Sequence, residues 1–140
     1  MSQADDHEEL RLLIQKVARR IRNNRSTGLS DSQLGVLFQL EAFGDRAPGE
    51  LAEHERVTPP SMNRTLNSLE TAGLVARSPA DDDARRVRVT LTPAGLALIG
   101  ETRALRSAWF AQQLAGLDPD DRRALDAALP VLRRLAQGPS

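Results

Sequence analysis

The segment from residue 47 to residue 91 constrains the fold of this 140-residue chain more than any other part of its sequence. It begins with a helix expected from Pro48, and a short turn separates this helix from a second one. Thr58 is a favourable N-cap for the second helix, Pro59 fits its first turn, and Gly73 stands just past its expected end. Because the turn is short, we expect the two helices to cross steeply.

Two short runs after the second helix are strand candidates, Leu74 to Arg77 and Val87 to Leu91. The second run alternates apolar and polar residues, which predicts a strand with one buried face. The residues between the runs, 78 to 86, are polar and rich in turn formers, so we expect a loop there. Two crossed helices followed by a hairpin form a winged helix-turn-helix.

Four further segments of the chain are predicted to be helical. Apolar residues at helical spacing indicate a helix over residues 8–23, and Ser30 has capping-box spacing for a helix that ends by Gly44. Pro93 opens a long helix that runs to about residue 114, and Asp118 opens the last one. We expect a mainly α chain with a small β-hairpin, in which N- and C-terminal helices flank a winged helix-turn-helix.

The second helix of the central segment has two different faces. On a helical wheel Met62, Leu66 and Leu69 form a core stripe, with Thr65 beside them. Short polar groups on the other side fit base edges, and an arginine can bridge O6 and N7 of guanine, so we expect this face to read a major groove. The alternative is a solvated helix face, although such a face usually carries Glu and Lys. The candidate major-groove residues are Thr58, Pro60, Ser61, Asn63, Arg64, Asn67 and Ser68.

The expected hairpin offers a second contact through Asp83, Arg85 and Arg86, at or near its tip. An arginine there can enter a narrow minor groove, and Asp83 could pair with Arg85 and orient it. The alternative is a charged turn whose three acids neutralise its arginines. Residues 47–91 carry six arginines and seven acids, and the whole chain has net charge +0, so binding to DNA requires cations grouped on one face.

Two strings of residues resemble the MarR family of regulators. One starts at Glu50-Leu51-Ala52 and continues through Val57-Thr58-Pro59-Pro60-Ser61-Met62-Asn63-Arg64 to Leu69-Glu70-Thr71-Ala72-Gly73-Leu74-Val75, and the other is Asp83-Ala84-Arg85 followed by Val87 to Gly95. The resemblance implies a homodimer in which Arg64 reads the major groove and Arg85 reaches the minor groove. It also implies a DNA-binding region over residues 30–91, with residues 47–91 as its reading core, and a dimerisation region over residues 1–29 and 92–140.

Apolar stripes on the flanking helices also favour a dimer. The helix from Pro93 has two stripes, one with Leu98, Leu105 and Trp109 and one with Leu96, Ile99, Phe110 and Leu114, whereas a single core needs one. Which stripe faces the partner stays open, and a monomer that buries both is the alternative. The candidate interface residues are Leu10, Leu13, Leu105, Phe110, Leu129 and Leu132.

The resemblance further implies a cleft for a small aromatic or phenolic acid between the dimer helices and the DNA-binding part. Ile14, Val17, Phe38 and Trp109 are candidates to line it, with Arg20 near enough to meet a carboxylate. Ordinary core packing of the same residues is the alternative. A ligand would act by favouring a dimer whose recognition helices are wrongly spaced for DNA.

Catalytic and metal sites are not indicated. The chain has no cysteine, its two histidines, His7 and His54, are far apart, and it has no glycine-rich phosphate loop. We therefore expect neither an enzyme nor a cofactor or metal. The acidic start and the lack of a long apolar run predict a cytoplasmic protein without a membrane segment. The expected function is a dimeric, sequence-specific repressor on a pseudo-palindromic site in double-stranded DNA, released by a small aromatic ligand, and the alternative is a winged helix that binds protein.

Overall fold

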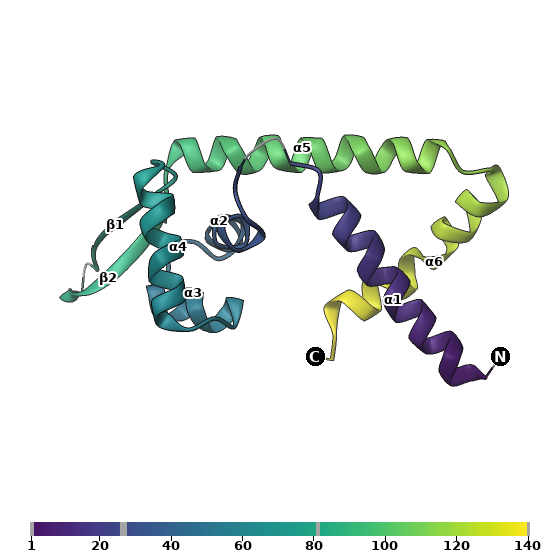
Figure 1. Ribbon diagram of the computed structural model, residues 1–140, viewed down its shortest axis with the longest axis horizontal. Helices are drawn as coiled ribbons and strands as arrows, with labels where there is room; N and C mark the ends of the chain where they lie inside the picture. Colours follow the sequence, from purple (N-terminus) through teal and green to yellow (C-terminus); the bar gives the residue numbers. More distant parts are fainter. Residues whose placement is uncertain (1, 26–27, 81, 140) are drawn as a thin grey trace.

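The structure, a computed structural model, describes residues 2–25, 28–80 and 82–139, without the side chains of residues 83 and 84. In this part the chain forms six helices and one antiparallel hairpin, mostly in the expected places (Figure 1). The winged helix-turn-helix lies at one end, and α5 extends from it toward α1 and α6. The elements are α1 (Gln3–Arg22), α2 (Asp31–Phe43), α3 (Pro48–Glu55), α4 (Pro59–Thr71), β1 (Val75–Ala80), β2 (Asp83–Leu91), α5 (Pro93–Ala115) and α6 (Pro119–Gln137).

A single apolar cluster holds the winged helix-turn-helix together. It combines residues of α2, α3, α4, both strands and the first turns of α5, and each of its main members is buried. The expected core stripe of α4 is confirmed, and Thr65 beside it is half-buried and donates to the carbonyl of Ser61 at 3.2 Å. The principal members are Leu37, Leu40, Leu51, Met62, Leu66, Leu69, Val75, Val89 and Ile99.

Local signals fix both ends of α4, as expected. The hydroxyl of Thr58 accepts the backbone N–H of Ser61 at 3.2 Å, which satisfies a donor that the first turn leaves free. The preceding turn contains Arg56 in the left-handed region, at φ 57°, and Val57 packs against the core. After the helix, Gly73 takes φ 76°, a conformation that costs glycine little, and the chain turns into β1.

Two of the expected boundaries are wrong. The first helix begins at Gln3 rather than near residue 8, because Ser2 and Asp5 form a capping box that extends it through an acidic turn. Residues 78–80 and 83–86 of the expected loop are strand, since Pro79 pairs with Val87 and Ala80 with Asp83. A two-stranded ribbon needs only backbone pairing, so its polar side chains do not end it.

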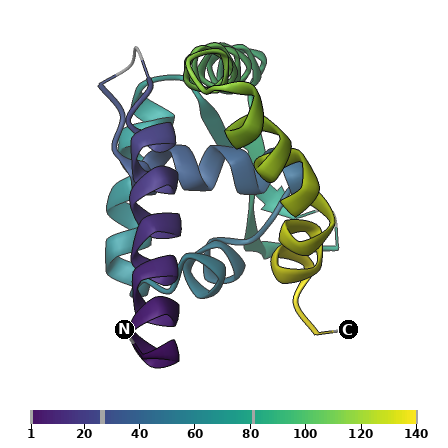
Figure 2. The same cartoon turned by 90° about the vertical axis from the view of Figure 1, so that its right-hand side faces the viewer.

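The two apolar stripes of α5 do not correspond to one buried face and one exposed face. Ile99 is buried and Leu98 packs against the core, although they belong to different stripes, while Leu105 and Phe110 are both exposed. The reason is position along the helix, because only its first half packs on the winged helix (Figure 1). Beyond it, α1 and α6 lie on different sides of the space below α5, apart from each other (Figure 2).

Candidate nucleic-acid interface

The outer face of α4 is polar and accessible. Pro60, Asn63, Arg64, Asn67 and Ser68 are exposed, and the buried stripe of the same helix lies opposite them. Ser61 is half-buried, and the hydroxyl of Thr58 is engaged in the cap. The helix therefore presents short hydrogen-bonding side chains and one guanidinium on a rigid base, a combination that fits a major groove.

An arginine that the sequence did not single out joins β1 to α4. Nη2 of Arg77 donates to Oδ1 of Asn67 at 2.8 Å and approaches the carbonyl of Asn63 at 3.4 Å. Arg77 is paired with Val89 across the hairpin, so both side chains lie on the face that packs on α4. The contact ties the hairpin to the outer face of α4.

The hairpin carries Arg85 and Arg86 inside β2 rather than in a loop, and both are exposed. The register of the ribbon shifts between Pro79 and Ala80, opposite this part of β2, so regular alternation of faces does not extend to Arg85 and Arg86. Arg86 lies 3.7 Å from a carboxylate oxygen of Asp82. The expected pairing of Asp83 with Arg85 falls on a side chain outside the described part of the structure.

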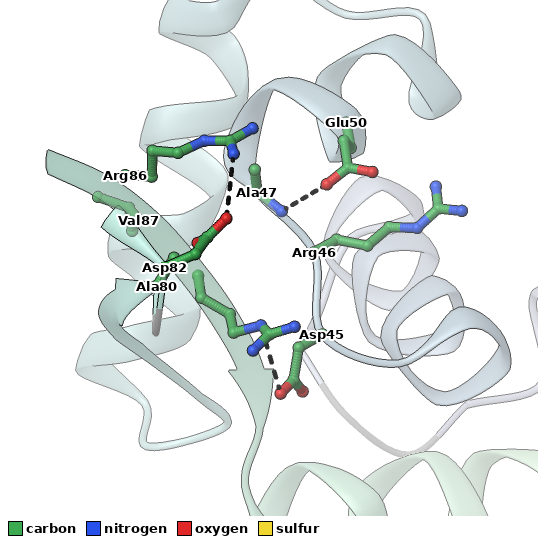
Figure 3. Close-up of a pocket in the computed structure, with 9 residues that line it drawn as sticks. Asp45, Arg46, Ala47, Glu50, Ala80, Asp82, Arg86 and Val87 are labelled. Atoms are coloured by element: carbon green, nitrogen blue, oxygen red, sulfur yellow. Dashed lines mark hydrogen bonds and ion pairs between the residues drawn. The ribbon is translucent and has the colours of Figure 1, made fainter. Parts of the chain in front are cut away.

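A charged pocket of about 290 Å³ lies between the hairpin and the connection from α2 to α3 (Figure 3). Arg88 approaches Asp45 at 3.8 Å on one side of it. Beside the pocket the backbones of Arg46 and Val89 exchange hydrogen bonds of 3.2 and 2.7 Å, which adds a third short strand segment to the ribbon. These contacts fix the base of the hairpin against the helices, and the acids in the pocket offset its arginines.

The flanking helices expose large apolar side chains. Among the described residues, neither α1 nor α6 has a buried residue. The six candidate interface residues are between 37% and 56% exposed, and they are Leu10, Leu13, Leu105, Phe110, Leu129 and Leu132. Exposed apolar surface of this extent on helices that lie apart is typical of an interface for another chain.

Comparison with known proteins agrees with this architecture. The sequence model of the MarR family matches residues 27–86. An HTH-type transcriptional regulator of Mycobacterium bovis, Mb0904, is 38% identical over 128 residues, which are 91% of this chain and 90% of that protein. The chain belongs to the MarR family of transcriptional regulators. Its relatives are transcriptional regulators rather than enzymes. This favours a role in transcription over the alternative of a winged helix that only binds protein.

Solved structures place the MarR-family fold over nearly the whole chain. A crystal structure of a Pseudomonas aeruginosa protein is 33% identical, covers 99% of this chain and 100% of that one, and has a TM-score of 0.83. A MarR mutant from E. coli is 25% identical, covers 91% and 96%, and has a TM-score of 0.75. The expected fold class, mainly α with a hairpin wing, is confirmed.

The candidate effector residues of this MarR-family chain divide into separate groups. The guanidinium of Arg20 stacks on the ring of Trp109, 5.0 Å from its centre, which brings two of the five together. Phe38 is half-buried beneath a different cation, Arg106, 5.3 Å from its ring centre. Ile14 and Val17 are exposed on α1, and Val17 stands one helical turn before Arg20.

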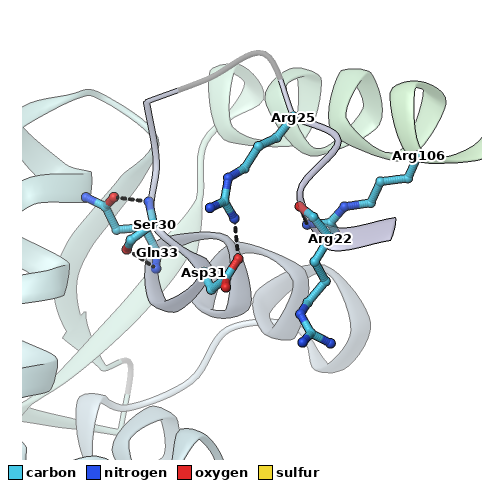
Figure 4. A network of polar contacts seen from close by, with 6 residues as sticks. All are labelled: Arg22, Arg25, Ser30, Asp31, Gln33 and Arg106. Carbon is cyan, nitrogen blue, oxygen red and sulfur yellow. Dashed lines mark hydrogen bonds and ion pairs between the residues drawn. The ribbon is translucent and has the colours of Figure 1, made fainter. Parts of the chain in front are cut away.

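Arg106 belongs to a polar network where α1, α2 and α5 meet (Figure 4). Its Nη2 approaches the carbonyl of Arg22 at 3.4 Å, and nearby Arg25 forms an ion pair with Asp31. Burial lowers the pKa of the Arg106 guanidinium, the charges of Arg25 and Arg22 lower it further, and Asp31 opposes them. Arg106 remains a cation at neutral pH, because arginine titrates far above it.

The described part of the structure offers neither a metal site nor a membrane-spanning helix. Within residues 2–25, 28–80 and 82–139, no group of histidines and carboxylates is arranged to hold a metal ion. None of the helices described there is long and apolar enough to cross a membrane.

Proposed function

We propose that this MarR-family regulator binds double-stranded DNA as a homodimer. Helix α4 of each subunit would enter the major groove of one half-site, and the hairpin would reach the adjacent minor groove through Arg85. The observation that carries the proposal is the outer face of α4, which is exposed, polar and backed by a buried apolar stripe. The candidate reading residues are those named above for that face, together with Asp83, Arg85 and Arg86 of the hairpin.

Local charge supports the proposal even though the chain as a whole is neutral. In the part of the chain that the structure describes, Arg64 is exposed and has no ion-pair partner. Acids instead pair with arginines elsewhere, as Asp82 does with Arg86 and Asp45 with Arg88. A cation without a competing carboxylate on a polar helix face is available for guanine or phosphate.

The dimer is supported by the exposed apolar surface of α1, α6 and the second half of α5. A second copy would cover that surface by pairing residues 1–29 and 92–140 of the two subunits, and residues 30–91 would form each DNA-binding region. Two recognition helices about one turn of DNA apart would then read a pseudo-palindrome.

Relatives support repression as the direction of regulation. An HTH-type transcriptional repressor of Mycobacterium bovis, Mb2911, is 35% identical over 105 residues, or 75% of this chain and 76% of that protein. The same fold occurs in an S. aureus MepR mutant that was crystallised with an oligodeoxyribonucleotide, at 18% identity and a TM-score of 0.71.

A small aromatic acid would bind near the stack of Arg20 on Trp109 and release the DNA. The stack supports this, because a guanidinium on an indole offers both a carboxylate partner and an aromatic surface. Quenching of Trp109 fluorescence by candidate phenolic acids tests it, and an unchanged emission with all of them would exclude Trp109 from the site.

The experiment that tests DNA binding compares the parent protein with Arg64→Ala on a duplex obtained by selection. Loss of Arg64 should weaken binding by about 1–3 kcal/mol, or roughly 5- to 150-fold, and relax discrimination at one base pair. Arg134→Ala is the matched control, because it removes the same charge from an exposed site on the side of α6 away from Leu129 and Leu132. Equal affinity of parent, variant and control would contradict the assigned reading face.

A further inference from the structure

The contact between Arg77 and Asn67 restricts how Asn67 can present its amide. Nη2 of Arg77 donates to Oδ1 of Asn67 at 2.8 Å and also approaches the carbonyl of Asn63, one turn earlier on α4. In the described structure Nε of Arg77 is buried without a hydrogen-bond partner. The guanidinium therefore lies against the helix, where it gives up hydration to reach these two oxygens.

The chemistry of the two groups fixes the orientation of the amide. A guanidinium can only donate hydrogen bonds, so it requires the oxygen of Asn67 and not its nitrogen. Rotation of the amide by half a turn would bring the NH₂ group against the N–H groups of Arg77, which places donors opposite donors. The oxygen of Asn67 is thus directed to the hairpin, and its NH₂ group is left for a partner outside the protein.

We propose that Arg77 is a positioning residue that makes Asn67 a donor-only reader of the major groove, so that Asn67 selects guanine over adenine. This inference rests on the proposed DNA binding through α4. An asparagine that reads adenine must accept from N6 and donate to N7 at once, so its oxygen and nitrogen must face the base edge together, whereas the contact with Arg77 turns the oxygen toward the hairpin. Guanine presents two acceptors, N7 and O6, and an NH₂ group with two hydrogens matches both.

A contact between Arg77 and Asn67 that only stabilises the fold would behave differently. Loss of such a contact would lower affinity for every DNA sequence to the same extent, without changing the preferred base at any position. A positioning role instead predicts a change of base preference at the one position that Asn67 reads, and this change must depend on Asn67 being present.

The test is an unbiased selection of bound DNA by the parent protein and by Arg77→Met, Asn67→Ala and the double variant. We expect guanine at the Asn67 position for the parent and a shift of at least about fivefold toward adenine for Arg77→Met, because the amide is then free to turn. When Asn67→Ala is already present, adding Arg77→Met should not change the base preference at that position. Arg88→Met is the matched control, since it removes a hairpin arginine that lies on the opposite face of β2 and approaches Asp45.

Asn67→Asp keeps the test informative if Arg77→Met fails to fold. The carboxylate preserves the contact with Arg77 but turns an acceptor outward, so the preferred base should change from guanine to cytosine, whose N4 donates. Adenine in the parent motif, or a motif unchanged by Arg77→Met and Asn67→Asp, overturns the inference while leaving DNA binding intact. If Asn67→Ala lowers affinity for all DNA sequences equally, as loss of a phosphate contact would, the inference is also overturned. Recovery of no motif by the parent would instead contradict the proposed function and the inference together.

Discussion

The proposed dimer predicts a large effect from two leucines of α6. Leu129 and Leu132 lie on one side of the helix and are 45% and 43% exposed in the single chain. Full burial of a leucine is worth about 1.5–3 kcal/mol, so covering the exposed part of each should contribute roughly 1 kcal/mol. A twofold dimer contains both residues twice, so four leucine side chains would be covered. Alanine retains only the Cβ of each, so most of their contribution is lost. We expect the combined change of Leu129→Ala and Leu132→Ala to weaken the dimer by roughly 2–4 kcal/mol, about 30- to 1,000-fold in its dissociation constant.

Sedimentation equilibrium over a range of protein concentrations measures this constant directly. Val131→Ala is the matched control, because Val131 is 46% exposed on the same helix but lies roughly 160° around it from Leu129. The control should dimerise like the parent, and circular dichroism should show unchanged helix content in all three proteins. A parent that sediments as a monomer, or a double variant with the parent's dissociation constant, would contradict a dimer interface at Leu129 and Leu132.

Two other predictions concern the packing of α5 and the hairpin. A Cβ at Gly95 would overlap the carbonyl of Leu74 and lie 2.8 Å from a methyl of Leu91, so Gly95→Ala should lower the free energy of unfolding by about 1–3 kcal/mol in urea titration. Gly100→Ala, where a Cβ meets nothing within 4 Å, should raise it by about 0.5–1 kcal/mol, and equal effects would show that the close approach is unimportant. Arg85→Ala should reduce the slope of log affinity against log salt concentration by about one, because a cation in the minor groove also displaces counterions, and an unchanged slope would contradict the contact of Arg85 with DNA.

Local signals made much of the fold predictable from the sequence. Thr58, Pro59 and Gly73 act through the backbone of their own helix, so the bounds of α4 followed from the residues alone. The buried stripe of Met62, Leu66 and Leu69 likewise follows from helical periodicity. The family resemblance came from the same segment, which the family model also matches.

Features that depend on relative placement were not predictable. The hairpin is longer than expected because strand pairing compensates for polar composition, and that pairing is a property of two segments together. The contact of Arg77 with Asn67 joins residues ten apart through the angle between β1 and α4, for which the sequence offers no signal beyond a long cationic side chain. The stripes of α5 were misassigned because burial there depends on where the winged helix ends.

In the proposed function two copies of this chain read DNA symmetrically, and unbiased selection of bound duplexes by the purified parent protein measures this symmetry. We expect an enriched pseudo-palindrome whose half-sites are centred about one helical turn apart, roughly 10–10.5 base pairs. Enrichment of a motif without twofold symmetry, or of no motif at all, would contradict it.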